Sequence, residues 1–144
     1  MALAKVRLLV AALWAGSLWA VGYLVAPTLF ATLSDRTLAG SIAGSMFHVE
    51  AMVSLGCGVA MGVLLWLATP DWTPKRRRTA LLLIVAMVMC TVASHFGLQP
   101  MMAELRATGL VDEAVKSRFG MLHGISSSIY LVQSLLAGWL VWKQ

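Results

Sequence analysis

Four long runs of apolar residues divide the chain, and short polar segments separate them. The runs cover about residues 6–33, 39–67, 79–102 and 119–142. A helix of about 20 residues crosses the ~30 Å hydrocarbon layer of a bilayer, so each run is long enough to span a membrane once. The pattern therefore predicts an all-α integral membrane protein with a single transmembrane domain over residues 1–144.

Lys5 and Arg7 stand at the start of the first run, so the N-terminal segment has the charge pattern of a secretory signal peptide. Its apolar stretch continues far beyond the 7–15 residues that are usual for the apolar region of a signal peptide. We therefore expect this segment to remain in the protein as a membrane span.

The short connections between runs favour antiparallel neighbours and hence an up-down-up-down four-helix bundle. In that topology one side holds seven of the 11 Lys and Arg residues: Lys5, Arg7, Lys75, Arg76, Arg77, Arg78 and Lys143. The basic residues of the other side are offset by acidic ones: Arg36, Arg106, Lys116 and Arg118 against Asp35, Glu104, Asp112 and Glu113. Because short loops rich in Lys and Arg stay cytoplasmic, both termini are predicted to be cytoplasmic. The basic run 75–78 has a second interpretation, as a patch for acidic lipids or for a partner.

The composition agrees with lipid as the main solvent. Hydrophobic residues make up 60% of the chain, charged residues make up 12%, and the mean hydropathy is +0.83. A soluble domain carries about 25% charged residues. The net charge of +5 is concentrated beside the spans, so topology explains it, and no nucleic-acid-binding module is indicated. Cys57 and Cys90 lie inside apolar runs and are predicted to be buried thiols rather than a disulfide.

Small residues recur at every fourth position, a spacing that lets helix backbones approach closely: Ala12, Gly16 and Ala20, then Gly40 and Gly44, then Gly58 and Gly62. An aromatic belt at the cytoplasmic face is predicted from Trp66, Trp72, Trp139 and Trp142. Pro100 is expected to end or kink the third helix. The segment from Gln99 to Arg106 then leaves the membrane toward a solvated outer loop.

Four ionisable side chains fall inside the spans, and the topology places all of them in the outer half of the bilayer: His48, Glu50, His95 and His123. A charged carboxylate in lipid is costly, so Glu50 is expected to be neutral, paired or facing a wet cavity. Helical spacing puts Glu50, Ser54, Cys57 and Met61 on one face, which is predicted to look into the bundle. His48 lies about 200° around the same helix from Glu50, so the two side chains do not point at one spot.

A second polar face is predicted on the fourth helix, with helical spacing: His123, Ser126, Ser127, Tyr130, Gln133 and Ser134. This face either forms hydrogen bonds between helices or lines a path for a ligand or proton. The two faces together define a candidate polar pocket: His48, Glu50, Ser54, His95, His123, Ser127 and Tyr130.

The three histidines His48, His95 and His123 are also candidate metal ligands, because imidazole binds iron, copper and zinc, and haem iron often takes an axial histidine. Their spacing contains no HExxH motif and no i, i+4 pair. A haem b or a metal ion is therefore one possible cofactor. The methionines are better explained as packing residues than as copper ligands.

Several segments resemble bacterial four-span membrane proteins akin to the eukaryotic transmembrane protein 205: residues 14–17 and 26–30, residues 40–47, Pro100 with Leu105 and Arg106, and residues 118–127. The last segment, with Phe119 and His123 before Gly124, Ile125 and Ser126, is the most specific. The resemblance covers the whole chain and implies this fold and topology in a bacterial cell inner membrane. The family is one of unknown function, so the resemblance implies no reaction.

A weaker likeness links the first span to membrane proteins of the copper-resistance D and protoporphyrinogen-oxidase J type, through Trp14, Gly16 and Pro27. Members of that group include haem enzymes with a histidine on the first helix. This chain has none there, so His48 and His95 would have to serve instead.

The sequence supports three hypotheses for function. The first is a four-helix membrane protein of unassigned activity whose outer polar pocket binds a small ligand, a lipid or a metal. The second is a haem- or quinone-linked redox protein. The third is an accessory subunit that contacts a membrane-protein partner, or a second copy of itself, through its small-residue faces and its basic loop.

Overall fold

The computed structural model describes residues 2–67 and 73–144, which form four helical rods joined by short turns. The first rod consists of α1 (Ala2–Trp19), η1 (Ala20–Val25) and α2 (Ala26–Thr32), and the second is α3 (Arg36–Leu67). The third consists of α4 (Pro74–Val92), η2 (Ala93–Leu98) and α5 (Gln99–Ala107), and the fourth is α6 (Glu113–Trp142). All four are long and apolar enough to cross a membrane. The predicted all-α, multi-pass membrane fold is confirmed for these residues.

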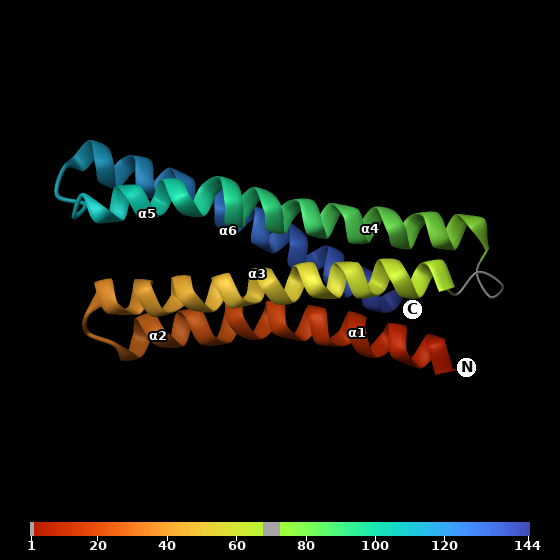
Figure 1. Ribbon diagram of the computed structural model, residues 1–144. Coiled ribbons are helices and arrows are strands. Elements are labelled where there is room, and N and C mark those ends of the chain that lie inside the picture. The colour runs from red at the N-terminus through yellow and green to blue at the C-terminus, as the bar shows by residue number, and fades with distance from the viewer. Residues whose placement is uncertain (1, 68–72) are drawn as a thin grey trace.

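The rods form a four-membered bundle in which α1 and α4 each pack against both α3 and α6. Both chain ends lie at one end of the bundle (Figure 1). We call it the basic end, because Lys5, Arg7, residues 75–78 and Lys143 belong to it. The turns at residues 33–35 and 108–112 lie at the opposite end, here called the far end (Figure 1). Successive rods therefore run antiparallel, as the short connections predict.

The helices extend beyond the predicted spans because polar side chains cap them. Asp35 Oδ1 accepts hydrogen bonds from the backbone N–H groups of Thr37 and Leu38 at 2.8 and 3.1 Å. Asp112 accepts from Ala114 N–H at 3.1 Å, and Thr73 accepts from Arg76 N–H at 3.4 Å. Such caps satisfy the amide groups that the first turn of a helix leaves free. The outer loop is consequently short.

The first and third rods share an unusual break. Each contains a six-residue π-helical segment, η1 or η2, and each has a proline shortly after it, Pro27 or Pro100. A proline in a helix lacks the N–H donor and clashes with the preceding turn, and a π-helical turn is one way to absorb that clash. Pro100 therefore does not end the helix, which continues through α5. One offset in sequence relates Ala20 to Ala93 and Pro27 to Pro100.

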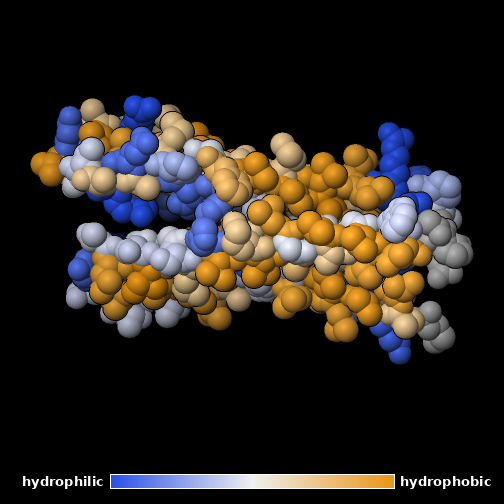
Figure 2. All heavy atoms as spheres, viewed as in Figure 1, coloured by the Kyte–Doolittle hydropathy of each residue, from blue (hydrophilic) through white to orange (hydrophobic). Residues whose placement is uncertain are grey.

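The hydrophobic core lies in the half of the bundle nearer the basic end. Its largest fully buried apolar side chains come from all four rods: Trp14, Leu18, Met61, Leu65, Met87 and Leu140. Toward the far end the rods separate as two hairpins, with α2 packed on α3 and α5 packed on α6. Figure 1 shows these pairs apart, and Figure 2 shows the hollow between them. The bundle is closed at the basic end and open at the far end.

The small residues play different parts from those predicted. Gly58 does allow close packing, since a Cβ there would lie 2.6 Å from Val88 Cγ2. Ala12, Gly16 and Ala20 are exposed on the outer surface, so this stripe brings no helices together within the chain. The stripe faces outward because α1 is turned so that Ala11, Trp14 and Leu18 form its inward face.

The tryptophans near the basic end have large exposed surfaces, as a belt at the membrane boundary requires. Trp66 is 70% exposed, Trp139 51% and Trp142 84%. Trp72 lies outside the described residues.

Candidate functional site

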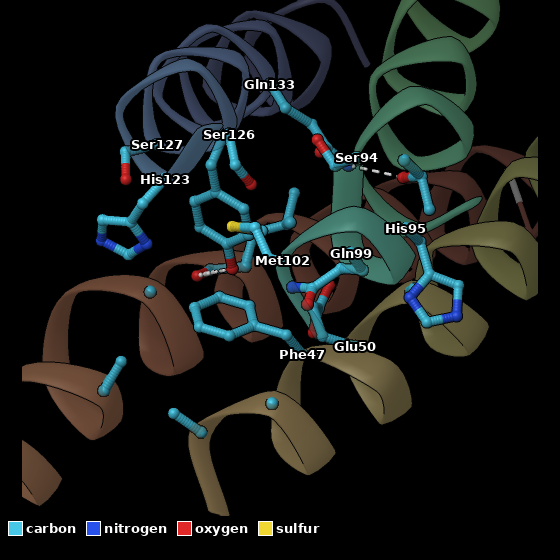
Figure 3. Close-up of a pocket in the computed structure, with 18 of the residues that line it drawn as sticks. Phe47, Glu50, Ser94, His95, Gln99, Met102, His123, Ser126, Ser127 and Gln133 are labelled. Carbon is cyan, nitrogen blue, oxygen red and sulfur yellow. Dashed lines mark hydrogen bonds between the residues drawn. The ribbon is translucent and has the colours of Figure 1, made fainter. Parts of the chain in front are cut away.

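A cavity of about 390 Å³ occupies the space between the diverging hairpins. Residues from η1, α2, α3, η2, α5 and α6 line it, with polar groups among aromatic and small side chains. In Figure 3, Phe47, Glu50, Gln99 and Met102 converge on it from two rods. Six of the seven predicted pocket residues are among its walls: Glu50, Ser54, His95, His123, Ser127 and Tyr130.

Glu50 lies in the cavity wall on α3 and is only 4% exposed. Its Oε1 atom accepts hydrogen bonds from Ser54 Oγ at 3.1 Å and from Ser17 Oγ at 3.3 Å. The other carboxyl oxygen, Oε2, has no hydrogen bond, and the carboxyl has no ion pair, among residues 2–67 and 73–144. One oxygen of a deeply placed carboxyl group therefore remains available to the cavity.

The face of α3 predicted to point inward is buried along its length. Ser54 and Met61 are 0% exposed, and Cys57 is also buried. Trp14 Nε1–H donates to Ser54 Oγ at 2.9 Å, so α1 holds this face from the other side. The spacing of polar residues along the second span thus identifies its inward face correctly.

The polar face of α6 forms hydrogen bonds between helices and also contributes to the cavity wall, while its role in a path for a ligand or proton stays a prediction. Tyr130 donates its phenol proton to the Leu18 carbonyl at 2.7 Å, and Gln133 Nε2 donates to Thr91 Oγ1 at 2.9 Å. These bonds tie α6 to α1 and α4. Tyr130 and Gln133 also line the cavity, as do His123, Ser126 and Ser127 nearer the far end.

Tyr130 is the centre of an aromatic cluster inside the cavity. Its ring meets Phe47 edge to face, with centroids 5.4 Å apart, and Tyr23 with centroids 6.2 Å apart. The ring also covers Gly22, where a Cβ would collide with it. Aromatic pairs in this geometry add to the stability gained from burial, and they give the cavity a rigid apolar wall.

His48 and His95 lie on different helices and form a pair. Nδ1 of His48 is 3.1 Å from Nε2 of His95. The His48 ring is exposed on the outer surface of α3, away from Glu50. Figure 3 shows that the His95 ring is directed away from Phe47 and Glu50. His48 is therefore the one predicted pocket residue that the cavity walls do not include.

His123 belongs to a separate group and stacks on Phe119, with ring centroids 6.2 Å apart. In the described part of the chain, no group of three or more His, Cys, Asp or Glu side chains is placed to hold a metal ion. The three histidines are therefore divided between two places, and their role as metal ligands stays a prediction.

Arg106 is a cavity residue that the sequence analysis assigned to the solvated outer loop. It lies on α5, and its guanidinium carbon is 5.6 Å from the centroid of the Phe119 ring. The available signal was spacing, because Gln99, Met102 and Arg106 follow at three and four residues and all line the cavity. Gly40 and Gly44 also line it, and a Cβ at either position would only touch the end of a side chain, Phe30 at 4.0 Å or Arg106 at 3.9 Å, so neither glycine marks a close approach of two helix backbones.

Ser94, in η2, also lines the cavity. Its Oγ atom is buried and has no hydrogen-bond partner among the described residues. Buried hydroxyl groups in native proteins are usually satisfied. Ser94 is thus a polar group of the cavity wall that a bound molecule could satisfy.

The comparisons with known proteins concern the same residues. A family model described as "Domain of unknown function (DUF4149)" matches residues 9–110. The chain belongs to this family. The match includes Glu50, His95 and Arg106 and ends before α6. The family is described as one of unknown function, so membership assigns no reaction to the cavity. The sequence analysis predicted membership of a family of unknown function. No curated protein and no solved structure matches the chain.

Proposed function

We propose that this DUF4149 protein binds a small molecule in the cavity between its two hairpins. The observation that carries the proposal is the cavity itself, at about 390 Å³, with the buried carboxyl of Glu50 in its wall. Ligand sites in proteins have volumes of about 300–1,000 Å³ and combine apolar walls with a few polar groups. A bundle that needed only stability would close this space, because empty volume costs free energy.

The polar groups of the cavity are arranged for recognition. Glu50 Oε2 and Ser94 Oγ have no hydrogen bonds with the described residues. Phe47 and Tyr130 supply flat apolar surface between the hairpins. An ionisable residue within a membrane span is a marker of function because its burial is costly. The proposed ligand therefore has an apolar part and at least one hydrogen-bond donor for Glu50.

The predicted orientation of the chain determines to which side of the membrane the cavity opens. The basic end is assigned to the cytoplasm by the excess of Lys and Arg there. The open far end then faces outward, and in a bacterial inner membrane the cavity belongs to the outer half of the bilayer. This placement rests on the charge rule and on the resemblance to bacterial proteins.

The test is to extract the protein from its native membrane in polymer nanodiscs and to identify bound small molecules by mass spectrometry. Gly44→Trp fills the cavity, because a Cβ at Gly44 meets only Arg106 Nη1, at 3.9 Å. Gly56→Trp is the matched control on the same helix, where a Cβ meets nothing within 4 Å and the residue is exposed. We expect wild type and the control to retain the same molecule, and Gly44→Trp to lose it. Equal retention by both variants, or no bound molecule in wild type, contradicts the proposal.

The same preparation separates the other functions. A Soret band in the visible spectrum, lost on substitution of His48 or His95, would favour the haem-linked protein over simple ligand binding. Recovery of a quinone would favour the quinone-linked protein. A second protein that co-purifies in fixed proportion, or a stable homo-oligomer, would favour the accessory subunit.

A further inference from the structure

The mouth of the cavity carries a positive charge that no described carboxylate neutralises. Arg106, at the far end of α5, lines the cavity. In residues 2–67 and 73–144 no carboxylate forms an ion pair with it; the one ion pair there joins Lys116 and Glu113 at 2.8 Å. The guanidinium group of Arg106 also donates no hydrogen bond to this part of the chain, although its backbone carbonyl accepts one from Gly109 N–H at 3.1 Å. Its N–H donors therefore have no acceptor among the described residues, and they lie at the cavity wall, where an anion can accept from them.

The neighbours of Arg106 hold its guanidinium group at this place. Its carbon Cζ is 5.6 Å from the centroid of the Phe119 ring, within the range of a cation–π contact. Phe119 stacks in turn on His123, with an angle of 8° between the rings. The Arg106 guanidinium, the Phe119 ring and the His123 imidazole thus form a stack between α5 and α6.

On the opposite side of the mouth, α3 carries glycine, which leaves space beside Arg106. Nη1 of Arg106 is 3.9 Å from the position of a Cβ at Gly44, so a larger side chain at Gly44 would take the space beside the guanidinium. Gly40, one turn earlier on α3, also lines the cavity. The predicted role of this glycine pair, close packing of two helices, is replaced here by room for a ligand.

Glu50 is too far along α3 to serve as the counter-ion of Arg106. Gly44, the residue beside Nη1, precedes Glu50 by six residues, which is about 9 Å along a helix axis. The carboxyl is also engaged by Ser17 and Ser54. The cavity therefore has a cationic mouth and a carboxyl deeper inside.

We propose that the ligand carries an anionic group, a phosphate or a carboxylate, on an apolar body, and that Arg106 binds this group at the cavity mouth. This inference rests on the proposed function of the cavity. Arginine matches such anions because its planar N–H groups form paired, charge-assisted hydrogen bonds with two oxygens. The apolar body lies against the rings of Phe47 and Tyr130, which contact each other and line the cavity below the mouth. A lipid head group and a water-soluble solute share this chemistry.

The experiment uses the purified full chain in a neutral detergent and native mass spectrometry with chosen probes. Dodecyl phosphate and dodecanol share an alkyl chain and differ in the anionic group. Phenyl phosphate is the water-soluble probe. The variants are Arg106→Gln and, as a control, Arg118→Gln, an exposed arginine on α6 outside the cavity wall. Melting temperatures establish that each variant is folded.

We expect wild type to bind dodecyl phosphate about tenfold more tightly than dodecanol, a ratio typical of one charge-assisted contact. Arg106→Gln should remove that preference, and Arg118→Gln should keep it. Phenyl phosphate binding that also depends on Arg106 indicates a soluble ligand, and dependence confined to dodecyl phosphate indicates a lipid.

Two results overturn the inference while the proposed function stands. One is equal binding of dodecyl phosphate and dodecanol to wild type. This result does not depend on whether any variant folds. The other is an unchanged preference for the phosphate in Arg106→Gln. If wild type binds none of the probes and Gly44→Trp also retains as much native material as wild type, both the inference and the proposed function fail.

Discussion

Ser54 donates its hydroxyl proton to Glu50, and the same hydroxyl oxygen accepts the indole proton of Trp14. The distances are 2.9 Å from Trp14 Nε1 and 3.1 Å to Glu50 Oε1. Ser54 is fully buried, and Glu50 is nearly so. A single serine thus joins the closed half of the bundle to the wall of the cavity.

Replacing Ser54 with alanine is expected to lower the free energy of unfolding by roughly 1–3 kcal/mol, since it leaves the buried Trp14 N–H without an acceptor. The measurement is unfolding of the purified protein in mixed micelles. Ser45→Ala is the control on the same helix, where the exposed hydroxyl bonds only to the Ser41 carbonyl. A change below about 0.5 kcal/mol is expected there. Equal effects from the two variants would contradict this account of Ser54.

Gly22→Ala should destabilise the protein by about 1–3 kcal/mol, because the new Cβ would collide with the Tyr130 ring and force it to move. Tyr130 would then lose its 2.7 Å hydrogen bond to Leu18. Gly97→Ala is the matched control in the other π-helical segment, where a Cβ meets nothing within 4 Å. Thermal unfolding of both variants checks this, and the idea fails if Gly97→Ala is the more harmful change.

Glu50→Gln keeps the shape of the side chain and an oxygen that accepts from Ser17 and Ser54. Stability should change by less than about 1 kcal/mol, the usual scale of one hydrogen bond between membrane helices. Occupancy of the cavity by its native ligand should fall severalfold, because the amide replaces an acceptor oxygen or a charge. Mass spectrometry of nanodisc preparations gives the occupancy. Unchanged occupancy would mean that Glu50 is not central to binding.

The proposed orientation is tested by labelling single cysteines in a background that lacks Cys57 and Cys90. Thr108→Cys, in the turn between α5 and α6, should react with a membrane-impermeant maleimide in intact cells. Lys75→Cys, at the basic end, should react only after the cells are permeabilised. The reverse pattern would place the cavity on the cytoplasmic side and would exclude the outward opening.

The sequence predicts the four spans and the inward face of the second because both depend on local patterns. Runs of apolar residues reveal membrane helices, and a spacing of three and four residues reveals the face that carries Glu50, Ser54 and Met61. The same reasoning places Tyr130 and Gln133 inward on the fourth span. Each of these residues lies on an uninterrupted α-helix, where spacing translates directly into direction.

The walls supplied by the first and third spans could not be predicted in this way. Thr91 and Gln99 both line the cavity, although eight residues of α-helix would turn them about 80° apart. The π-helical segment η2 between them takes up about one extra residue and restores the common face. Arg106 follows Gln99 at helical spacing on that face, but Pro100 and the charged residues around Arg106 led to its assignment to the outer loop. The pairing of His48 with His95 depends on how two helices are rotated, which no local pattern contains.

The repeated break in the first and third spans has a consequence for the ligand. The offset that relates Pro27 to Pro100 also relates Glu50 to His123 and Ser54 to Ser127. The two hairpins thus carry the same π-helical break and proline at one sequence offset, and the cavity lies between them. Equivalent positions carry an acid in one hairpin and a base in the other. If the cavity binds a ligand as proposed, that ligand meets Glu50 from one hairpin and His123 from the other, and these unlike partners would favour one orientation of the ligand.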